Sequence, residues 1–118
     1  MTFAPVKRKT LEINGDVYEV LPSELEIAEM VSEFEKELQR MGKKYANKKP
    51  GAGQGELKDV CDIFKMPVVG VEKMLGEGAL AKIMGGASVP FAKATEVFER
   101  VSSAVLAMYE ADNKKLYE

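Results

Sequence analysis

Hydrophobic residues near the start of the chain alternate with polar ones, as they do in a half-buried β-strand. The alternation runs through the stretch TLEINGDVYEVLP, on either side of the pair Asn14-Gly15. Asn-Gly suits a two-residue type I′ turn because both turn positions require a positive φ. The pattern predicts a β-hairpin over residues 6–21. A lone hairpin is marginally stable in water, so we expect it to pack on helices, to pair with another chain or to become ordered on a partner.

A helical period replaces this alternation after Pro22. Ser23, with Glu26 three positions later, forms a capping box, and the acids of the early turns and the lysines of the last turn suit the helix dipole. One seam of apolar residues steps by four and three positions: Ile27, Val31, Phe34, Leu38, Met41 and Tyr45. That spacing predicts a long helix over residues 23–46. The glycine-rich segment over residues 47–55 is then expected to be a flexible surface loop.

The middle of the chain, residues 56–86, predicts a broken helix followed by a glycine joint. Apolar residues keep the helical period from Leu57 to Leu75. Pro67 interrupts this run because its ring clashes with the carbonyl group four residues earlier, so we expect a kink or two shorter helices that meet at Lys65-Met66. Glycines flank a predicted short helix at residues 79–84 and form the structural joint: Gly76, Gly78, Gly85 and Gly86.

A second long seam predicts a final helix over residues 88–112. Ser88 is the expected N-cap, with Pro90 in the first turn. The seam again steps by three and four positions: Phe91, Ala94, Phe98, Val101, Val105 and Met108. The expected fold is a single domain over residues 1–118 that is mainly α with a small N-terminal β-hairpin, its two long helices packed around the broken middle helix.

Composition argues against most catalytic chemistry. The 118 residues include no His, no Trp and a single Cys, so the commonest general base and metal ligand is missing. We therefore expect no enzyme activity, no cofactor and no metal site. Cys61 lies among apolar neighbours in LKDVCDIF and is expected to be a buried structural thiol.

Charge and hydropathy bear on the class of partner. Seventeen basic residues against nineteen acidic ones give no positive field for nucleic acid. No apolar run approaches the roughly 18 residues that a membrane span needs, and the bases near the N-terminus are followed by no apolar stretch of a secretory signal. The expected location is therefore the cytoplasm.

The glycine-rich stretch LGEGALAKIMGG invites a nucleotide-binding interpretation, which its details exclude. A Walker A loop needs Gly-Lys followed by Ser or Thr, and a Rossmann fingerprint needs a third glycine where this stretch has Leu80-Ala81. The stretch is typical of a helix-ending joint. The seven methionines leave two alternatives open, plain core packing or an adaptable surface for a flexible partner.

The order of these features resembles the small tail assembly chaperones of long-tailed, siphovirus-like bacteriophages and of prophages of Gram-positive bacteria. The resemblance rests on the segments INGDVYEV, CDIF, GEGALAKIMGG and FAKATEVFERV, in that order along roughly residues 10–110. Leu75-Gly76-Glu77-Gly78 and Met84-Gly85-Gly86 match the two glycine turns of that family, with Leu75 and Met84 where the family usually has aromatic residues. Pro67 and the loop at residues 50–55 depart from its pattern.

The resemblance implies a protein that binds the phage tape-measure protein, keeps it soluble during tail morphogenesis and helps to recruit the tail-tube protein in the cytoplasm of the bacterial host. Residues of the two seams would then serve helix packing, with some exposed to a partner or to a second copy in a homo-oligomer: Phe34, Leu38, Met41, Phe98, Val101 and Val105. The alternative is a structural, self-associating helical component of the phage tail or head-tail region. A DNA-binding regulator would need a basic recognition helix, which the sequence lacks.

Overall fold

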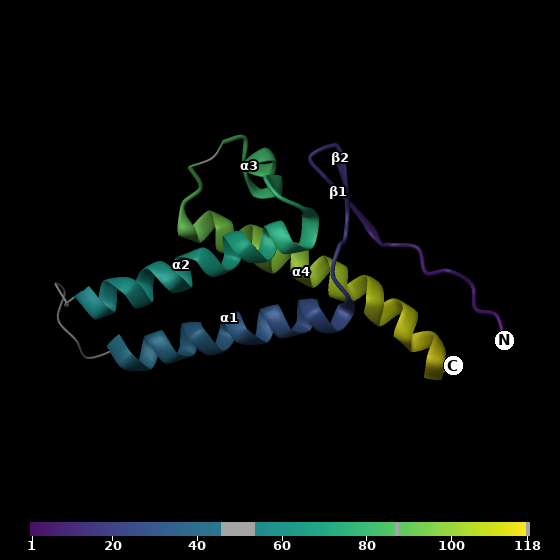
Figure 1. Ribbon diagram of the computed structural model, residues 1–118, viewed down its shortest axis with the longest axis horizontal. Coiled ribbons are helices and arrows are strands. Elements are labelled where there is room, and N and C mark those ends of the chain that lie inside the picture. The colour runs from purple at the N-terminus through teal and green to yellow at the C-terminus, as the bar shows by residue number, and fades with distance from the viewer. Residues whose placement is uncertain (46–53, 87, 118) are drawn as a thin grey trace.

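Helices make up most of the molecule, and a small hairpin precedes them (Figure 1). The computed structural model describes residues 1–45, 54–86 and 88–117. Its elements in chain order are β1 (Thr10–Ile13), β2 (Asp16–Glu19), α1 (Glu24–Tyr45), α2 (Gln54–Leu75), α3 (Ala79–Met84), α4 (Phe91–Lys114) and the short 3-10 helix η1 (Lys115–Tyr117). The predicted fold class, mainly helical with a small N-terminal β-hairpin, is confirmed.

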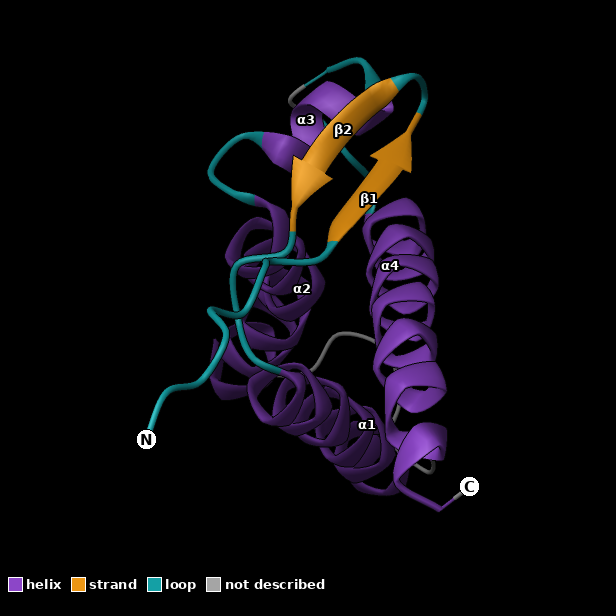
Figure 2. Cartoon of the chain, turned by 90° about the vertical axis from the view of Figure 1, so that its right-hand side faces the viewer, coloured by secondary structure: helices purple, strands orange, loops and turns teal. Residues whose placement is uncertain are grey.

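The hairpin is antiparallel and shorter than predicted, with strands only between residues 10 and 19. Asn14 and Gly15 have φ values of 53° and 84°, the left-handed conformation that a type I′ turn requires. The hairpin lies over α3 and α4 (Figure 2). Asn14 Nδ2 donates a hydrogen bond of 3.0 Å to the carbonyl oxygen of Ile83, and the Tyr18 side chain is buried. Of the three possibilities for a lone hairpin, packing on the helices is the one observed.

Helix α1 begins as the capping box predicts. The backbone N–H of Glu26 donates a hydrogen bond of 3.2 Å to Ser23 Oγ, which satisfies one of the free donors of the first turn. The helix spans Glu24–Tyr45 and so starts one residue later than expected, while its expected end at residue 46 lies outside the described residues. Most of the loop predicted over residues 47–55 lies outside the described residues, but Gln54 and Gly55 already belong to α2.

Helix α2 is continuous, so the predicted alternative of two shorter helices that meet at Lys65-Met66 is wrong. Pro67 lies inside the helix and is almost completely buried. Its ring removes one backbone hydrogen bond. The buried side chains before and after it, Ile63 and Val71, belong to the same core, and their burial stabilises the helix on both sides of the proline.

The chain breaks instead at the glycine joint, whose predicted role is confirmed. Gly76 and Gly78 have φ values of 110° and 80°, and Gly85, at the end of α3, has a φ of 75°. Such values are strained for any residue with a Cβ atom. Gly86 is outside the left-handed region, and its N–H donates a hydrogen bond of 2.9 Å to the carbonyl oxygen of Ala81. The joint therefore turns the chain twice around one short helix.

Helix α4 begins later than predicted, and Ser88 is not its N-cap. The capping position is Pro90, with extended backbone angles (φ −61°, ψ 151°) and no side-chain capping bond. Pro90 disfavours a helical conformation for the residue before it, so the helix starts at Phe91. The carbonyl oxygen of Pro90 accepts a hydrogen bond of 2.9 Å from the N–H of Ala94.

The core lies between α1, α2 and α4 and extends under the hairpin and α3. Aromatic rings join the three long helices: Phe34 meets Phe98 edge to face at 5.4 Å, and Phe64 stacks on Phe91 at 4.3 Å between ring centroids. The molecule measures 60 × 34 × 23 Å and has a radius of gyration of 17.2 Å. A compact chain of this length would have a radius near 13.5 Å, and both the long helices and the extended residues 1–8 add to the observed value (Figure 1).

Candidate protein-binding groove

A groove of about 770 Å³ runs between α1 and α2. Its floor is apolar and its rim is charged. The residues of α1, α2 and α4 that line it are Glu26, Glu29, Met30, Glu33, Phe34, Asp62, Lys65, Met66, Val69, Gly70, Lys73 and Phe98. Leu21 and Pro22, in the connection from β2 to α1, complete the lining at one end.

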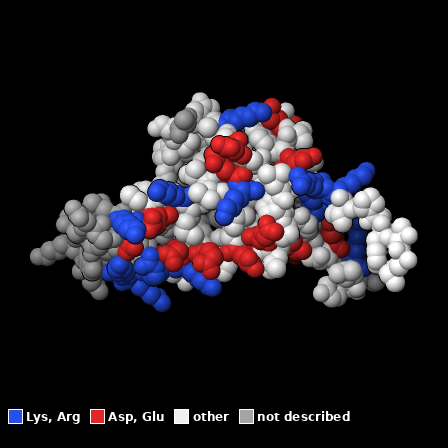
Figure 3. Space-filling model, in the orientation of Figure 1, with Lys and Arg blue, Asp and Glu red and all other residues white. Residues whose placement is uncertain are grey.

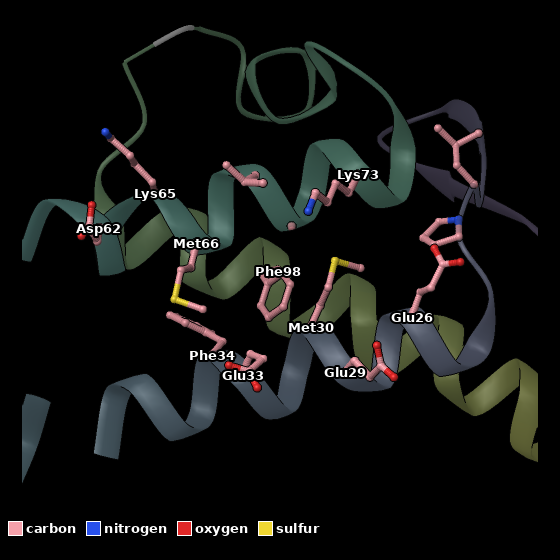
Figure 4. A pocket seen from close by; sticks show the side chains of 14 residues that line it. Glu26, Glu29, Met30, Glu33, Phe34, Asp62, Lys65, Met66, Lys73 and Phe98 are labelled. Atoms are coloured by element: carbon pink, nitrogen blue, oxygen red, sulfur yellow. The ribbon is translucent and has the colours of Figure 1, made fainter. Parts of the chain in front are cut away.

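The floor combines two rigid rings with two flexible side chains. Phe34 and Phe98 pack edge to face at its base. Met30 extends from α1 toward α2, and Met66 extends from α2 toward α1, so their sulfur atoms lie in the space between the helices (Figure 4). Methionine side chains adapt to partners of different shape. Val69 adds further apolar surface and is 45% exposed.

The rim carries opposite charges on its two sides. Glu26, Glu29 and Glu33 follow one another along one face of α1, at spacings of three and four residues. Lys65 and Lys73 stand on the α2 side, with Asp62 beside them. Figure 3 shows acidic side chains gathered along α1 and basic ones over α2. Four carboxylates and two ammonium groups give the rim a formal charge of −2.

Hydrogen bonds and one ion pair hold the two helices at either end of the groove. The N–H of Leu21 donates a hydrogen bond of 2.9 Å to the carbonyl oxygen of Met74, which ties the connection before α1 to the last turn of α2. Near the other end, Lys44 Nζ lies 2.6 Å from Asp59 Oδ2. These two contacts help to set the spacing of α1 and α2, and therefore the width of the groove.

The residues predicted from the two seams fall in different places. All four of Phe34, Phe98, Val101 and Val105 are buried in the core, but only the two phenylalanines also line the groove. Two more members of the set, Met41 and Leu38, lie farther along α1, the first half-buried and the second exposed, and neither lines the groove.

Sequence reasoning missed Val69 and the charged rim as parts of a site. The methionine content was the signal closest to the groove, since it left an adaptable surface open as one alternative. Met30 and Met66 are the two methionines that form that surface.

A second hollow of about 470 Å³ lies between the hairpin, α3 and α4. Three of its charged residues pair within α4: Glu96 lies 3.4 Å from Lys93 Nζ and 3.6 Å from a nitrogen of Arg100. Lys82, on α3, lies 3.8 Å from Asp16 of the hairpin. Of these contacts only the last joins two elements, the hairpin and α3.

Cys61 is exposed, so the predicted buried thiol is wrong. It precedes the buried Ile63 by two positions, which turns it about 200° around the helix, away from the core. Among the described residues no group of three or more His, Cys, Asp or Glu side chains could hold a metal ion. Within the same residues, no helix has both the length and the apolarity needed to cross a membrane.

Comparison of the chain with protein-family models, with curated proteins and with solved structures finds no match.

Proposed function

We propose that this chain is a phage or prophage tail assembly chaperone, which binds the tape-measure protein and keeps it soluble during tail morphogenesis in the cytoplasm of the bacterial host. The observation that carries the proposal is the open groove between α1 and α2, with its apolar floor and charged rim. The order of sequence features that resembles the chaperone family supports it. By the same resemblance the tail-tube protein is a second partner.

A helical segment suits this groove physically. Apolar side chains of an amphipathic helix, spaced three and four residues apart, would pack between Met30 and Met66 and replace water on Val69. The volume of about 770 Å³ accommodates a few side chains and not a whole helix, so the partner helix would lie along the rim. The rim carboxylates would remain solvated and oppose aggregation of the complex.

Keeping such a partner soluble needs no chemical step. A long helical chain with an unpaired apolar stripe associates with other copies through that stripe. A chaperone that covers the apolar stripe removes the hydrophobic driving force for this association. A groove whose floor contains two methionines accepts apolar stripes of varied sequence. The contact must also be reversible, which fits a shallow groove better than a closed cavity.

Co-expression with the tape-measure protein encoded in the same gene cluster tests the proposal. We expect most of the tape-measure protein in the soluble fraction when this chain is present and in the pellet when it is absent. An equal soluble fraction in the two cultures would contradict the proposal.

The second candidate is a self-associating structural protein of the phage tail or head-tail region. Exposed apolar side chains on the helices, Leu25, Leu38 and Phe64, favour it because an exposed apolar surface also suits assembly. Purified mature particles separate the two functions. A structural component would be present in them in stoichiometric amounts, and a chaperone would be absent.

A further inference from the structure

The first eight residues form an extended arm, MTFAPVKR, that leaves the rest of the fold (Figure 1). Its root is fixed at Lys9, whose Nζ lies 2.6 Å from Asp112 Oδ2 on α4 and 5.1 Å from the centre of the Tyr109 ring. From this root the arm runs away from the α1–α2 groove of its own chain. Phe3 and Val6 are 81% and 96% exposed.

The arm and the groove have complementary surfaces. The arm presents apolar side chains followed by Lys7 and Arg8, and the groove presents an apolar floor beneath a rim of charge −2. Arg8 is held only loosely, at 3.7 Å from Glu19, with both side chains largely exposed. An exposed ion pair of this kind contributes little to stability. Arg8 can therefore leave Glu19 and pair with another carboxylate at a small cost in free energy.

We propose that the arm of one copy lies in the α1–α2 groove of a second copy, and that two copies exchange arms in a two-fold dimer. Phe3 and Val6 pack against the floor around Val69, and Lys7 and Arg8 lie beside Glu29 and Glu33 of the α1 rim. A reciprocal exchange of this kind closes the assembly at two copies, because each arm and each groove is used once.

The lengths of arm and groove agree. From Phe3 to Arg8 an extended chain spans about 17 Å, and the α1 side of the groove, from Glu26 to Phe34, rises about 12 Å. Pro5 fixes its own φ and favours an extended conformation for the residue before it. The arm is therefore partly ordered before it binds, which lowers the entropy that docking costs.

Sedimentation velocity on the isolated chain tests the exchange through charge reversal. The wild-type protein should sediment at twice the chain mass of 13.0 kDa at high concentration. The arm variant K7E/R8E and the rim variant E29K/E33K should each be monomeric, and the chain that carries all four substitutions should dimerise again. The variant K43E/K58E, with the same change in charge outside arm and groove, should remain dimeric. A monomeric wild type, a dimeric K7E/R8E or a lack of rescue would overturn the inference.

Disulfide trapping identifies the copy that supplies the arm. In a Cys61→Ser background, one tagged chain carries Val6→Cys and a second, differently tagged chain carries Val69→Cys. Mild oxidation of the mixture should give a heterodimer that contains both tags. In a chain that carries both substitutions, a cross-link confined to that chain would place the arm in its own groove and overturn the exchange.

The inference does not depend on the identity of the cargo. A chain that exchanges arms but fails to keep the tape-measure protein soluble would refute the proposed function alone. A monomeric chain that keeps it soluble would refute the exchange alone.

Discussion

The Phe98 ring lies against the backbone of Gly70, so closely that a Cβ atom at residue 70 would come within 2.4 Å of Phe98 Cε2. Both residues line the groove, and their contact sets how near α2 comes to α4. A ring in a packed core cannot move far enough to make room for that Cβ atom without displacing its neighbours. The close approach therefore depends on the absence of a side chain at one position of α2.

Gly70→Ala should destabilise the fold, although alanine favours a helix more than glycine does. The clash with Phe98 should cost about 1–3 kcal/mol, more than the roughly 1 kcal/mol gained in helix propensity. Urea unfolding followed by circular dichroism measures the difference. The control is Gly42→Ala in α1, where a Cβ would meet nothing within 4 Å and the substitution should stabilise. Equal stabilisation by the two substitutions would show that α2 and α4 are farther apart than described.

Gly78→Ala should weaken the glycine joint through the backbone alone. Gly78 has a φ of 80°, and a Cβ there would meet nothing within 4 Å. An L-residue in the left-handed region costs about 1–2 kcal/mol, which should appear as a lower free energy of unfolding. Gly86→Ala also has open space and lies outside the left-handed region, so it should leave stability nearly unchanged. A neutral Gly78→Ala would contradict the assigned joint geometry.

The ion pair at the root of the arm should make stability depend on pH. The hydrogen bond from Lys9, and then its charge, hold the pKa of the Asp112 carboxyl below the ordinary 3.8. A carboxylate with a lowered folded pKa stabilises the fold above 3.8 and loses this contribution as the pH falls through the folded pKa.

Asp112→Asn should therefore lower the free energy of unfolding at neutral pH and low salt. The difference from the wild type should shrink as the solution is acidified below pH 3.8. Glu110→Gln, a matched change two residues earlier on α4, leaves the pair of Lys9 and Asp112 intact and should unfold with the free energy of the wild type at neutral pH. A difference for Asp112→Asn that stays constant into strong acid would exclude the ion pair as its cause.

Arm exchange and cargo binding would compete, because both proposals use the α1–α2 groove. A labelled helical fragment of the tape-measure protein should bind K7E/R8E several-fold more tightly than wild type, since the groove of the variant is already free. Fluorescence anisotropy at a chain concentration where the wild type is dimeric measures this difference. Under the same conditions K43E/K58E should bind as the wild type does, and equal affinity of all three proteins would show that arm and cargo do not share the groove.

Features with a local cause were predictable from the sequence. The Asn14-Gly15 turn, the Ser23 cap and the glycine joint each depend on the conformational preferences of a few neighbouring residues, and each is confirmed. The errors at Pro67 and Cys61 arose where tertiary packing determines whether a helix continues and which of its faces is buried. Periodicity alone does not say which stripe of a long helix is buried, or that burial on both sides of a proline keeps the helix continuous.

The groove could be predicted only in part. Its Phe34 and Phe98 belong to the predicted seams, and for its methionines the sequence left core packing and an adaptable surface as open alternatives. Its width depends on the contact of Gly70 with Phe98 and on the hydrogen bond from Leu21 to Met74, which join residues far apart in sequence. No pattern within a single helix contains that information.

The most direct test of the groove as the cargo site is the soluble fraction of the tape-measure protein, co-expressed with two matched variants. Val69→Glu places a carboxylate on the apolar floor, and Val17→Glu makes the same change on the exposed face of the hairpin. Circular dichroism should show both variants folded. We predict that Val69→Glu lowers the soluble fraction to the level found without this chain, because cargo binding would have to desolvate the new carboxylate, which is costly even where Lys65 or Lys73 pairs with it. Val17→Glu should match the wild type. A soluble fraction unchanged by Val69→Glu would contradict the groove as the binding site.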